Sequence, residues 1–170
     1  EYNSEYSFYV LESGNNSIHN NTFKSNDDGP AKFESSYYNI FRDNNLNAND
    51  DYLHIEGGGQ NSILNNTFIE NGILIQNANN QIIMGNTITD APDNGIRIFK
   101  SSSNNYLSDN SISDSDDEDI YVGGSGSQNN NRGFNNDFSS IKVQGNGEFI
   151  VLDYIGLRTV NSEGNMSGND

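Results

Sequence analysis

Four residues between positions 90 and 100 carry groups that could modify a polysaccharide. Asp90 and Asp93 supply carboxylates, and Arg97 and Lys100 supply cationic groups a few positions later. Lyase chemistry on an acidic polysaccharide needs carboxylates that hold calcium and a basic side chain that removes a proton. These four residues are therefore the candidate catalytic set, on the condition that they converge on one face.

A second chemical pattern is acidic and recurs along the chain. Aspartate and glutamate residues gather four to seven positions after a repeated asparagine. Carboxylates stacked along one edge repel each other unless water, salt or calcium screens them. One interpretation is a calcium site, and the alternative is that these residues only solvate loop corners. The candidate calcium ligands are Asp50, Asp51, Asp114, Asp116 and Asp117.

Composition narrows the remaining classes of function. The net charge is -16, from 24 acidic and 8 basic residues, which argues against nucleic acid as a partner because phosphates need Lys and Arg. No cysteine is present, so disulfides and thiolate metal sites are excluded. The two histidines, His19 and His54, fall at different repeat positions, which argues against a copper or zinc site. No apolar run has the length of a membrane span.

The elements that must position these groups come from a repeated phrase, Asn-x-apolar. Successive copies lie 20 to 26 residues apart, a period typical of solenoids whose coils stack on one another. Asparagine tolerates a left-handed corner, and stacked asparagine side chains can bond amide to amide between coils. We therefore expect a structural ladder of Asn21, Asn44, Asn66, Asn86, Asn110 and Asn136.

Two further columns complete each coil. A second Asn, or Gln81 in the fourth coil, stands five residues before each ladder asparagine. Still earlier, two apolar residues alternate with polar ones, which is typical of a strand. Ile96 and Ile98 fit this position one residue out of step in the fifth coil, and Ile120 and Val122 fit it after a longer insertion in the sixth. This pattern predicts three short strands in each coil. It therefore predicts that the chain is an all-β parallel β-helix of about six to seven coils of 20–26 residues.

The repeat also predicts how the chain is divided. Residues 1–144 are expected to form the coils, and residues 145–160 a C-terminal cap or final coil, because an open solenoid end exposes core and strand edges. Residues 161–170 are polar and are expected to form a tail or linker. The abrupt start at Glu1 suggests a mature or excised fragment of a longer protein.

One stretch resembles a known family. The phrase Gly95-Ile96-Arg97-Ile98, followed by residues 102–112, resembles the repeat of right-handed β-helix proteins of the NosD type, within the carbohydrate-binding and sugar-hydrolase class. The resemblance covers residues 8 to about 140 and implies a right-handed helix. It does not imply one activity, because the class includes surface-layer and adhesin-like proteins, carbohydrate binders, copper-site accessory proteins, lyases, hydrolases and epimerases.

The catalytic phrases of that class are missing from the sequence. Proteins that resemble polygalacturonases carry Asn-Thr-Asp, Gly-His-Gly and Arg-Ile-Lys, whereas here Ile88 follows the Asn-Thr and Phe99 follows the Arg-Ile. Neither Pro30 nor Pro92 belongs to the Asp-Pro-His-Glu phrase expected of alginate epimerases. The sequence therefore favours a module without catalysis, and a polysaccharide lyase or hydrolase is the alternative.

The location and partners of the protein are predicted from its glycosylation sequons and its tyrosines. Sequons at Asn15, Asn20, Asn65 and Asn165 permit N-glycosylation, which favours a secreted or cell-surface protein. We expect a structural, adhesive or glycan-binding role, with calcium as the one cofactor considered. A third hypothesis is an assembly subunit that contacts other copies or neighbouring domains through residues 149–157. The tyrosines that could stack on sugar rings are Tyr37, Tyr38, Tyr52, Tyr106 and Tyr121.

Overall fold

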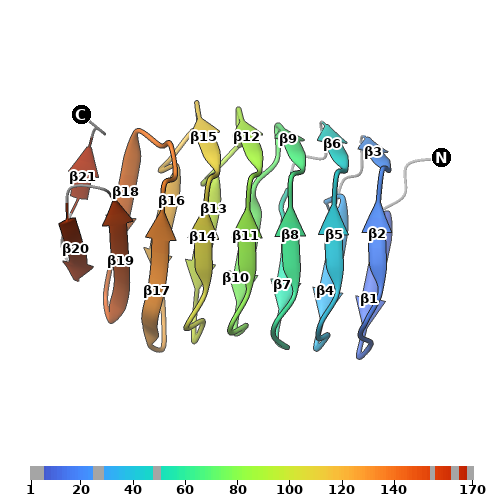
Figure 1. Cartoon of the computed structure of the whole chain (residues 1–170), viewed down its shortest axis with the longest axis horizontal. Coiled ribbons are helices and arrows are strands. Elements are labelled where there is room, and N and C mark those ends of the chain that lie inside the picture. Colours follow the sequence, from blue (N-terminus) through green and yellow to red (C-terminus); the bar gives the residue numbers. More distant parts are fainter. Residues whose placement is uncertain (1–5, 25–28, 48–50, 154–155, 162–164, 168–170) are drawn as a thin grey trace.

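The chain forms a solenoid of stacked β coils (Figure 1). The computed structural model describes residues 6–24, 29–47, 51–153, 156–161 and 165–167, with side chains described through Val151. Each of the first five coils contributes three short strands, and the described part of the chain contains no α-helix. The prediction of an all-β parallel solenoid with three strands per coil is confirmed.

The strands form three sheets that run along the solenoid. Sheet 1 contains β1 (Phe8–Leu11), β4 (Ala31–Glu34), β7 (Leu53–Glu56), β10 (Ile73–Gln76), β13 (Ile96–Phe99), β16 (Ile120–Gly123), β18 (Ser140–Val143) and β21 (Asn165–Ser167). Sheet 2 contains β2 (Ser17–His19), β5 (Ile40–Arg42), β8 (Ser62–Leu64), β11 (Ile82–Met84), β14 (Tyr106–Ser108), β17 (Gln128–Phe134), β19 (Gly147–Asp153) and β20 (Gly156–Asn161). Sheet 3 contains β3 (Thr22–Lys24), β6 (Asn45–Asn47), β9 (Thr67–Ile69), β12 (Thr87–Thr89) and β15 (Ser111–Ser113).

The core is a narrow stack of apolar side chains, with one or two from each strand. In sheet 1 the first and third residues of a strand point inward and the second and fourth outward, whereas in the three-residue strands only the middle residue is buried. Register follows these side chains: Ile75 pairs with Ile98, and Ile98 with Val122. The shifted fifth coil and the insertion in the sixth are therefore confirmed. Full burial of such a side chain stabilises by about 1.5–3 kcal/mol, which explains how a chain that is only 32% hydrophobic folds.

The predicted asparagine ladder is present in all six coils. Asn66 is representative: its Oδ1 accepts hydrogen bonds from the backbone N–H and the Nδ2 of Asn44, at 2.9 and 3.1 Å. Its Nδ2 donates to Asn86 Oδ1 and to the carbonyl of Phe41, both at 3.0 Å. All four hydrogen-bonding positions of this buried amide are therefore filled. The inter-coil amide bonds join Asn21, Asn44, Asn66, Asn86, Asn110 and Asn136 in that order.

The left-handed corners are not made by the ladder asparagines themselves. The residue just before each one has positive φ, for example Asp43 at 55° and Asn65 at 53°, while Asn44 and Asn66 do not. The same division holds at the second column, where Asn104 at 58° precedes the buried Asn105. The ladder asparagines therefore stack their amides between coils, whereas the residue before each of them forms the left-handed corner.

The C-terminal end departs from the parallel pattern. Strand β19 continues sheet 2 in parallel with β17, but β20 then pairs with β19 antiparallel. On sheet 1, β21 pairs antiparallel with β18. The predicted boundaries at residues 144 and 160 stay predictions. So does self-association through residues 149–157, of which Phe149 is fully buried in this chain.

Candidate functional site

The outward side chains of sheet 1 bring charged, aromatic and amide groups together on one surface. They come from the second and fourth positions of its strands, so residues from successive coils lie side by side at the strand spacing of about 4.8 Å. We call this surface the sheet 1 face. Its members include Tyr9, Lys32, Glu34, His54, Glu56, Leu74, Gln76, Arg97, Phe99 and Tyr121.

One half of the sheet 1 face is a network of charged groups centred on Lys32. Its Nζ lies 2.9 Å from Glu34 and 2.8 Å from Glu56, and Gln76 Nε2 donates to Glu56 Oε1 at 2.9 Å. Partial burial acts to lower the pKa of Lys32, but the hydrogen bonds to both glutamates outweigh it and raise that pKa. The hydrogen bond from Lys32 lowers the pKa of each glutamate. Lys32, Glu34 and Glu56 therefore all stay charged at neutral pH.

His54 lies between Lys32 and Leu74 on the same face. Its Nδ1 is 3.3 Å from the hydroxyl of Tyr6, while its Nε2 is buried and has no hydrogen-bond partner among the described residues. Burial lowers the pKa of this imidazole below its usual value. The ring is therefore neutral at physiological pH and adds no cation to the surface.

The other half of the sheet 1 face is organised around Arg97. The centre of its guanidinium lies 4.6 Å from the ring centroid of Phe99 and 5.4 Å from that of Tyr121. One terminal nitrogen lies 3.1 Å from Asp93 Oδ2, and the buried Nε has no partner among the described residues. Rings and a carboxylate thus fix the plane of the guanidinium before any ligand arrives.

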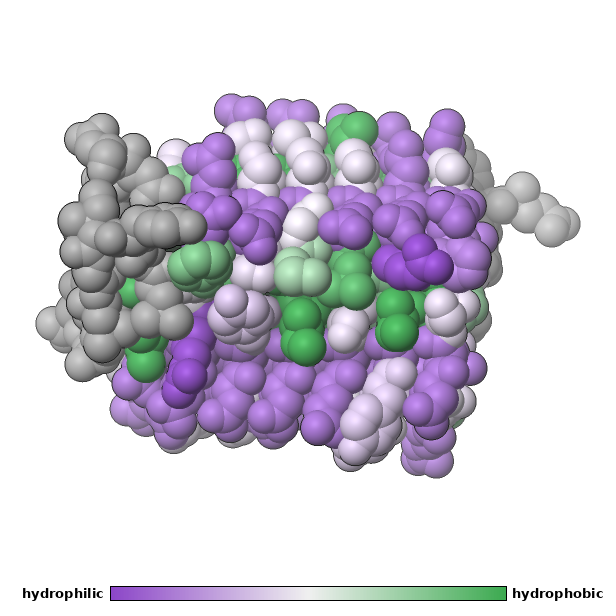
Figure 2. Space-filling model, viewed as in Figure 1, coloured by the Kyte–Doolittle hydropathy of each residue, from purple (hydrophilic) through white to green (hydrophobic). Residues whose placement is uncertain are grey.

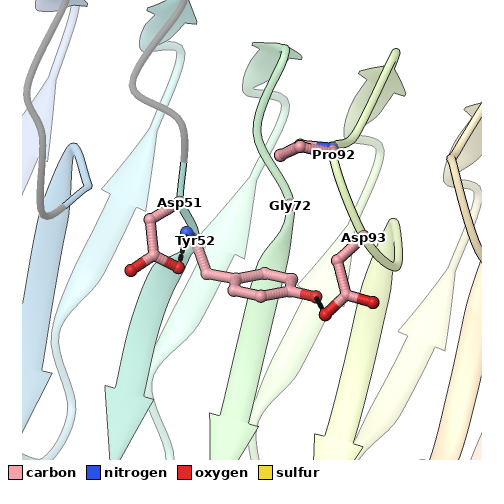
Figure 3. A pocket seen from close by; sticks show the side chains of 5 residues that line it. All are labelled: Asp51, Tyr52, Gly72, Pro92 and Asp93. Atoms are coloured by element: carbon pink, nitrogen blue, oxygen red, sulfur yellow. Dashed lines mark hydrogen bonds between the residues drawn. The ribbon is translucent and has the colours of Figure 1, made fainter.

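A cavity of about 230 Å³ lies at the corner where chain segments enter sheet 1 (Figure 3). One of its lining residues is Asp93, the ion-pair partner of Arg97. Tyr52 crosses it, and its hydroxyl donates to Asp93 Oδ2 at 2.7 Å and accepts the backbone N–H of Asn94 at 3.1 Å. Burial and the bond to Asp93 raise the pKa of Tyr52. The phenol is therefore a fixed hydrogen-bond donor and a poor base. The lining residues are Asp51, Tyr52, Gly72, Pro92 and Asp93.

The predicted catalytic set is only partly assembled. Asp93 and Arg97 form an ion pair, but Asp90 is exposed just after β12, and Lys100 lies past the far end of β13 with its Nζ 5.9 Å from the Phe99 ring centroid. In the described part of the chain, neither Asp90 nor Lys100 forms an ion pair with the central two. The carboxylate that joins Asp93 is Asp117, whose pKa is raised because it shares a hydrogen bond with Asp93.

The predicted calcium ligands do not form a recognisable site where they can be followed. Asp50 lies outside the described residues, and Asp51 accepts the backbone N–H of Tyr52 at 2.7 Å. Asp114, Asp116 and Asp117 are exposed at the corner after β15. No three Asp, Glu or His side chains of the described ranges are grouped so as to hold an ion. Calcium binding stays a prediction.

The remaining sequence candidates fall on different surfaces. Tyr37 and Tyr38 are exposed at the corner between sheets 1 and 2, and Tyr106 is exposed on sheet 2. The sequon residues Asn15, Asn20 and Asn65 are exposed corner residues, and the side chain of Asn165 lies outside the described residues. Glycosylation stays a prediction. The sequence analysis did not identify Lys32 and Glu56 as one network or Phe99 as a partner of Arg97, although their outward positions in the period-two pattern were a usable signal.

Comparison with known proteins places this architecture. The family model described as the right-handed β-helix region matches residues 1–161. The chain belongs to the right-handed β-helix family. No curated protein and no solved structure matches it. In the described part of this β-helix no helix is long and apolar enough to cross a membrane.

Proposed function

We propose that this right-handed β-helix is a non-catalytic glycan-binding module of a secreted or cell-surface protein, and that the sheet 1 face is its binding surface. The observation that carries the proposal is the arrangement at Arg97, whose guanidinium is stacked on Phe99 and Tyr121 and bonded to Asp93. Aromatic rings pack against the apolar faces of sugar rings, and fixed planar polar groups hydrogen-bond sugar hydroxyls.

The extent of the face suits a polymer better than a single sugar. Lys32 and Arg97 lie three coils apart in sheet 1, which corresponds to about 14 Å at the strand spacing. The Lys32 network and the Arg97 cluster would contact different sugar units of one chain. Because the side chains are already paired within the protein, little side-chain entropy is lost when a glycan binds.

The carboxylate geometry supports binding over hydrolysis. Glycosidases hold two carboxyl groups about 5–5.5 Å apart when they retain configuration and about 6.5–9.5 Å apart when they invert it. Asp93 and Asp117 instead interact directly: the backbone N–H of Asp117 donates to the Asp93 carbonyl at 3.1 Å, and a hydrogen bond with the Asp93 side chain raises the pKa of Asp117. Asp93 also accepts a hydrogen bond from the Tyr52 hydroxyl and forms an ion pair with Arg97.

The test is a binding titration against a library of soluble plant, microbial and animal polysaccharides, with release of reducing ends measured in parallel. We expect binding by the natural protein and no release. Arg97→Lys keeps the charge but loses the planar fork and should weaken binding about tenfold, and Arg97→Met should weaken it further. Lys24→Met, which removes an exposed cation from sheet 3, is the matched control. Absence of binding across the library, or equal binding by Arg97→Met, would contradict the proposal.

A further inference from the structure

A second polar cavity lies around the corner from the sheet 1 face, where the chain enters sheet 2. It has a volume of about 310 Å³. Beside it, an apolar patch lies over the middle of sheet 2, as Figure 2 shows, and includes the exposed side chains of Ile82 and Met84. The residues that line the cavity are Asn80, Asn104, Asn105, Tyr106, Asn130 and Arg132.

Three stacked amides form one wall of this cavity. Asn80, Asn104 and Asn130 occupy equivalent corner positions in three successive coils, with φ of 58°, 58° and 54°. The second-column residue after each one, Gln81, Asn105 or Asn131, is buried, so the corner residue is the one that projects. In the part of the chain that the structure describes, the side-chain amides of these three residues form no hydrogen bond with the protein. Each amide therefore has both a donor and an acceptor available to a ligand.

The floor of the cavity joins an aromatic ring to a cation. Tyr106 and Arg132 are direct partners in the parallel pairing of β14 with β17, so their outward side chains are neighbours. Tyr106 is 36% exposed. Within the described ranges, the ion pairs involve Lys32, Arg42, Arg97 and Lys142 and leave Arg132 unpaired. An unpaired guanidinium is notable in a chain with a net charge of -16.

We propose that this cavity is a second saccharide site, which binds a single sugar unit carrying an anionic substituent. The ring of Tyr106 stacks on the sugar, the amides exchange hydrogen bonds with its hydroxyls, and Arg132 pairs with its carboxylate or sulfate. The cavity is at the small end of ligand pockets in proteins, which suits one unit rather than a polymer. The site is independent of the sheet 1 face, because none of its lining residues belongs to that face.

A carboxylate at the edge of the cavity should weaken the binding of an anionic sugar. Glu148 accepts the backbone N–H of Asn130 at 2.9 Å, which places its negative charge at the edge of the site. An anionic ligand is repelled by this group and attracted by Arg132. Glu148→Gln keeps an acceptor for Asn130 but removes the charge, so it should tighten binding of the anionic sugar.

The experiment follows the side-chain amide signals of the three asparagines by nuclear magnetic resonance during titration with glucuronate, glucose 6-sulfate and glucose. Saturable shifts with glucuronate or with the sulfate support the proposal and identify the anionic group. Arg132→Gln should weaken that binding about tenfold and Glu148→Gln should tighten it several-fold. Arg42→Gln, which removes another cation from sheet 2, and Arg97→Met on the sheet 1 face should leave it unchanged.

Several results would overturn this second site. One is an absence of saturable shifts with both anionic sugars, and another is binding of glucose as tight as that of glucuronate. Unchanged affinity in Arg132→Gln would also contradict it, and because Arg132 is exposed, this variant is expected to fold normally. Failure here leaves glycan binding on the sheet 1 face intact, since Arg97→Met tests that surface separately.

Discussion

Asn66 donates two hydrogen bonds to a single atom, Asn86 Oδ1, from its backbone N–H at 2.9 Å and from its Nδ2 at 3.0 Å. The same pair of bonds links each ladder asparagine to the next coil. The ladder thus satisfies backbone groups that the tight corners remove from the sheets. Without it, each corner would bury unpaired polar groups beside the core.

Replacing Asn66 by alanine tests this role. The acceptor of two bonds from Asn44 and the donor to the Phe41 carbonyl are both lost. Because the partners are buried, we expect the free energy of unfolding to fall by about 2–4 kcal/mol, measured by urea denaturation. Asn45→Ala, at an exposed position of β6, should change it by less than about 0.5 kcal/mol. Equal effects of the two substitutions would show that the ladder is not a stabilising element.

Gln81 is the one position of the second column that is not asparagine, and replacing it should increase stability. Its Nε2 turns back to the carbonyl of Asn79 at 2.9 Å, whereas the Nδ2 groups of Asn16, Asn39 and Asn105 donate to the next asparagine of this column, at 3.0 Å in the case of Asn105 and Asn131. The backbone N–H of Gln81 already donates to Asn105 Oδ1 at 2.9 Å. Gln81→Asn should add a side-chain donation to the same atom and raise the free energy of unfolding by about 0.5–1.5 kcal/mol. A loss of stability in the same urea titration would mean that the longer side chain is needed for packing.

His54 should make stability depend on pH near neutrality. Burial lowers its folded-state pKa, so below the unfolded pKa of about 6.5 the unfolded chain binds the proton more readily than the folded chain. The contribution of His54 to stability should therefore be constant above that pH and fall as the pH drops below it. His54→Gln should reduce the change in the urea midpoint between pH 7.5 and 5.5. His19→Gln, at an exposed position, should leave that change as it is. A midpoint profile unaltered by His54→Gln would contradict this interpretation.

Lys32 should control the ionisation of its two glutamates. The hydrogen bond from Lys32 lowers the pKa of both Glu34 and Glu56. In Lys32→Met these pKa values should rise toward the ordinary value of about 4.3, as followed by carbon-detected nuclear magnetic resonance during acid titration. Lys24→Met provides the comparison with a distant cation. If the glutamate pKa values stay low without Lys32, the network is not held by this residue.

Repetition explains why so much of the fold could be predicted from the sequence. Six copies of Asn-x-apolar determine the coil length, the buried column and the ladder, so each coil supports the interpretation of the others. Even the one-residue shift at Ile98 can be predicted from the sequence. A strand of sheet 1 that paired one residue out of register would turn its buried side chains toward solvent.

The candidate site could be predicted much less well, because it depends on pairings that the repeat does not determine. Asp93 contacts Tyr52, which lies 41 positions earlier and two coils away. Lys32 forms an ion pair with Glu56 of the next coil, and the guanidinium of Arg97 contacts the ring of Tyr121 in the coil after its own. Sequence proximity instead grouped Asp90 and Lys100 with Asp93, although the ends of strands and turns separate them.

The most direct test of the central claim is to map where a bound glycan lies. A backbone-amide titration of the isotope-labelled protein, with a polysaccharide fragment that binds, should shift signals of Lys32, Glu56, Arg97, Phe99 and Tyr121 on sheet 1. Sheet 3 should be unaffected, and the fragment should remain uncleaved. Shifts confined to sheet 3, or cleavage of the fragment by the natural protein, would contradict the account of sheet 1 as a non-catalytic glycan-binding face.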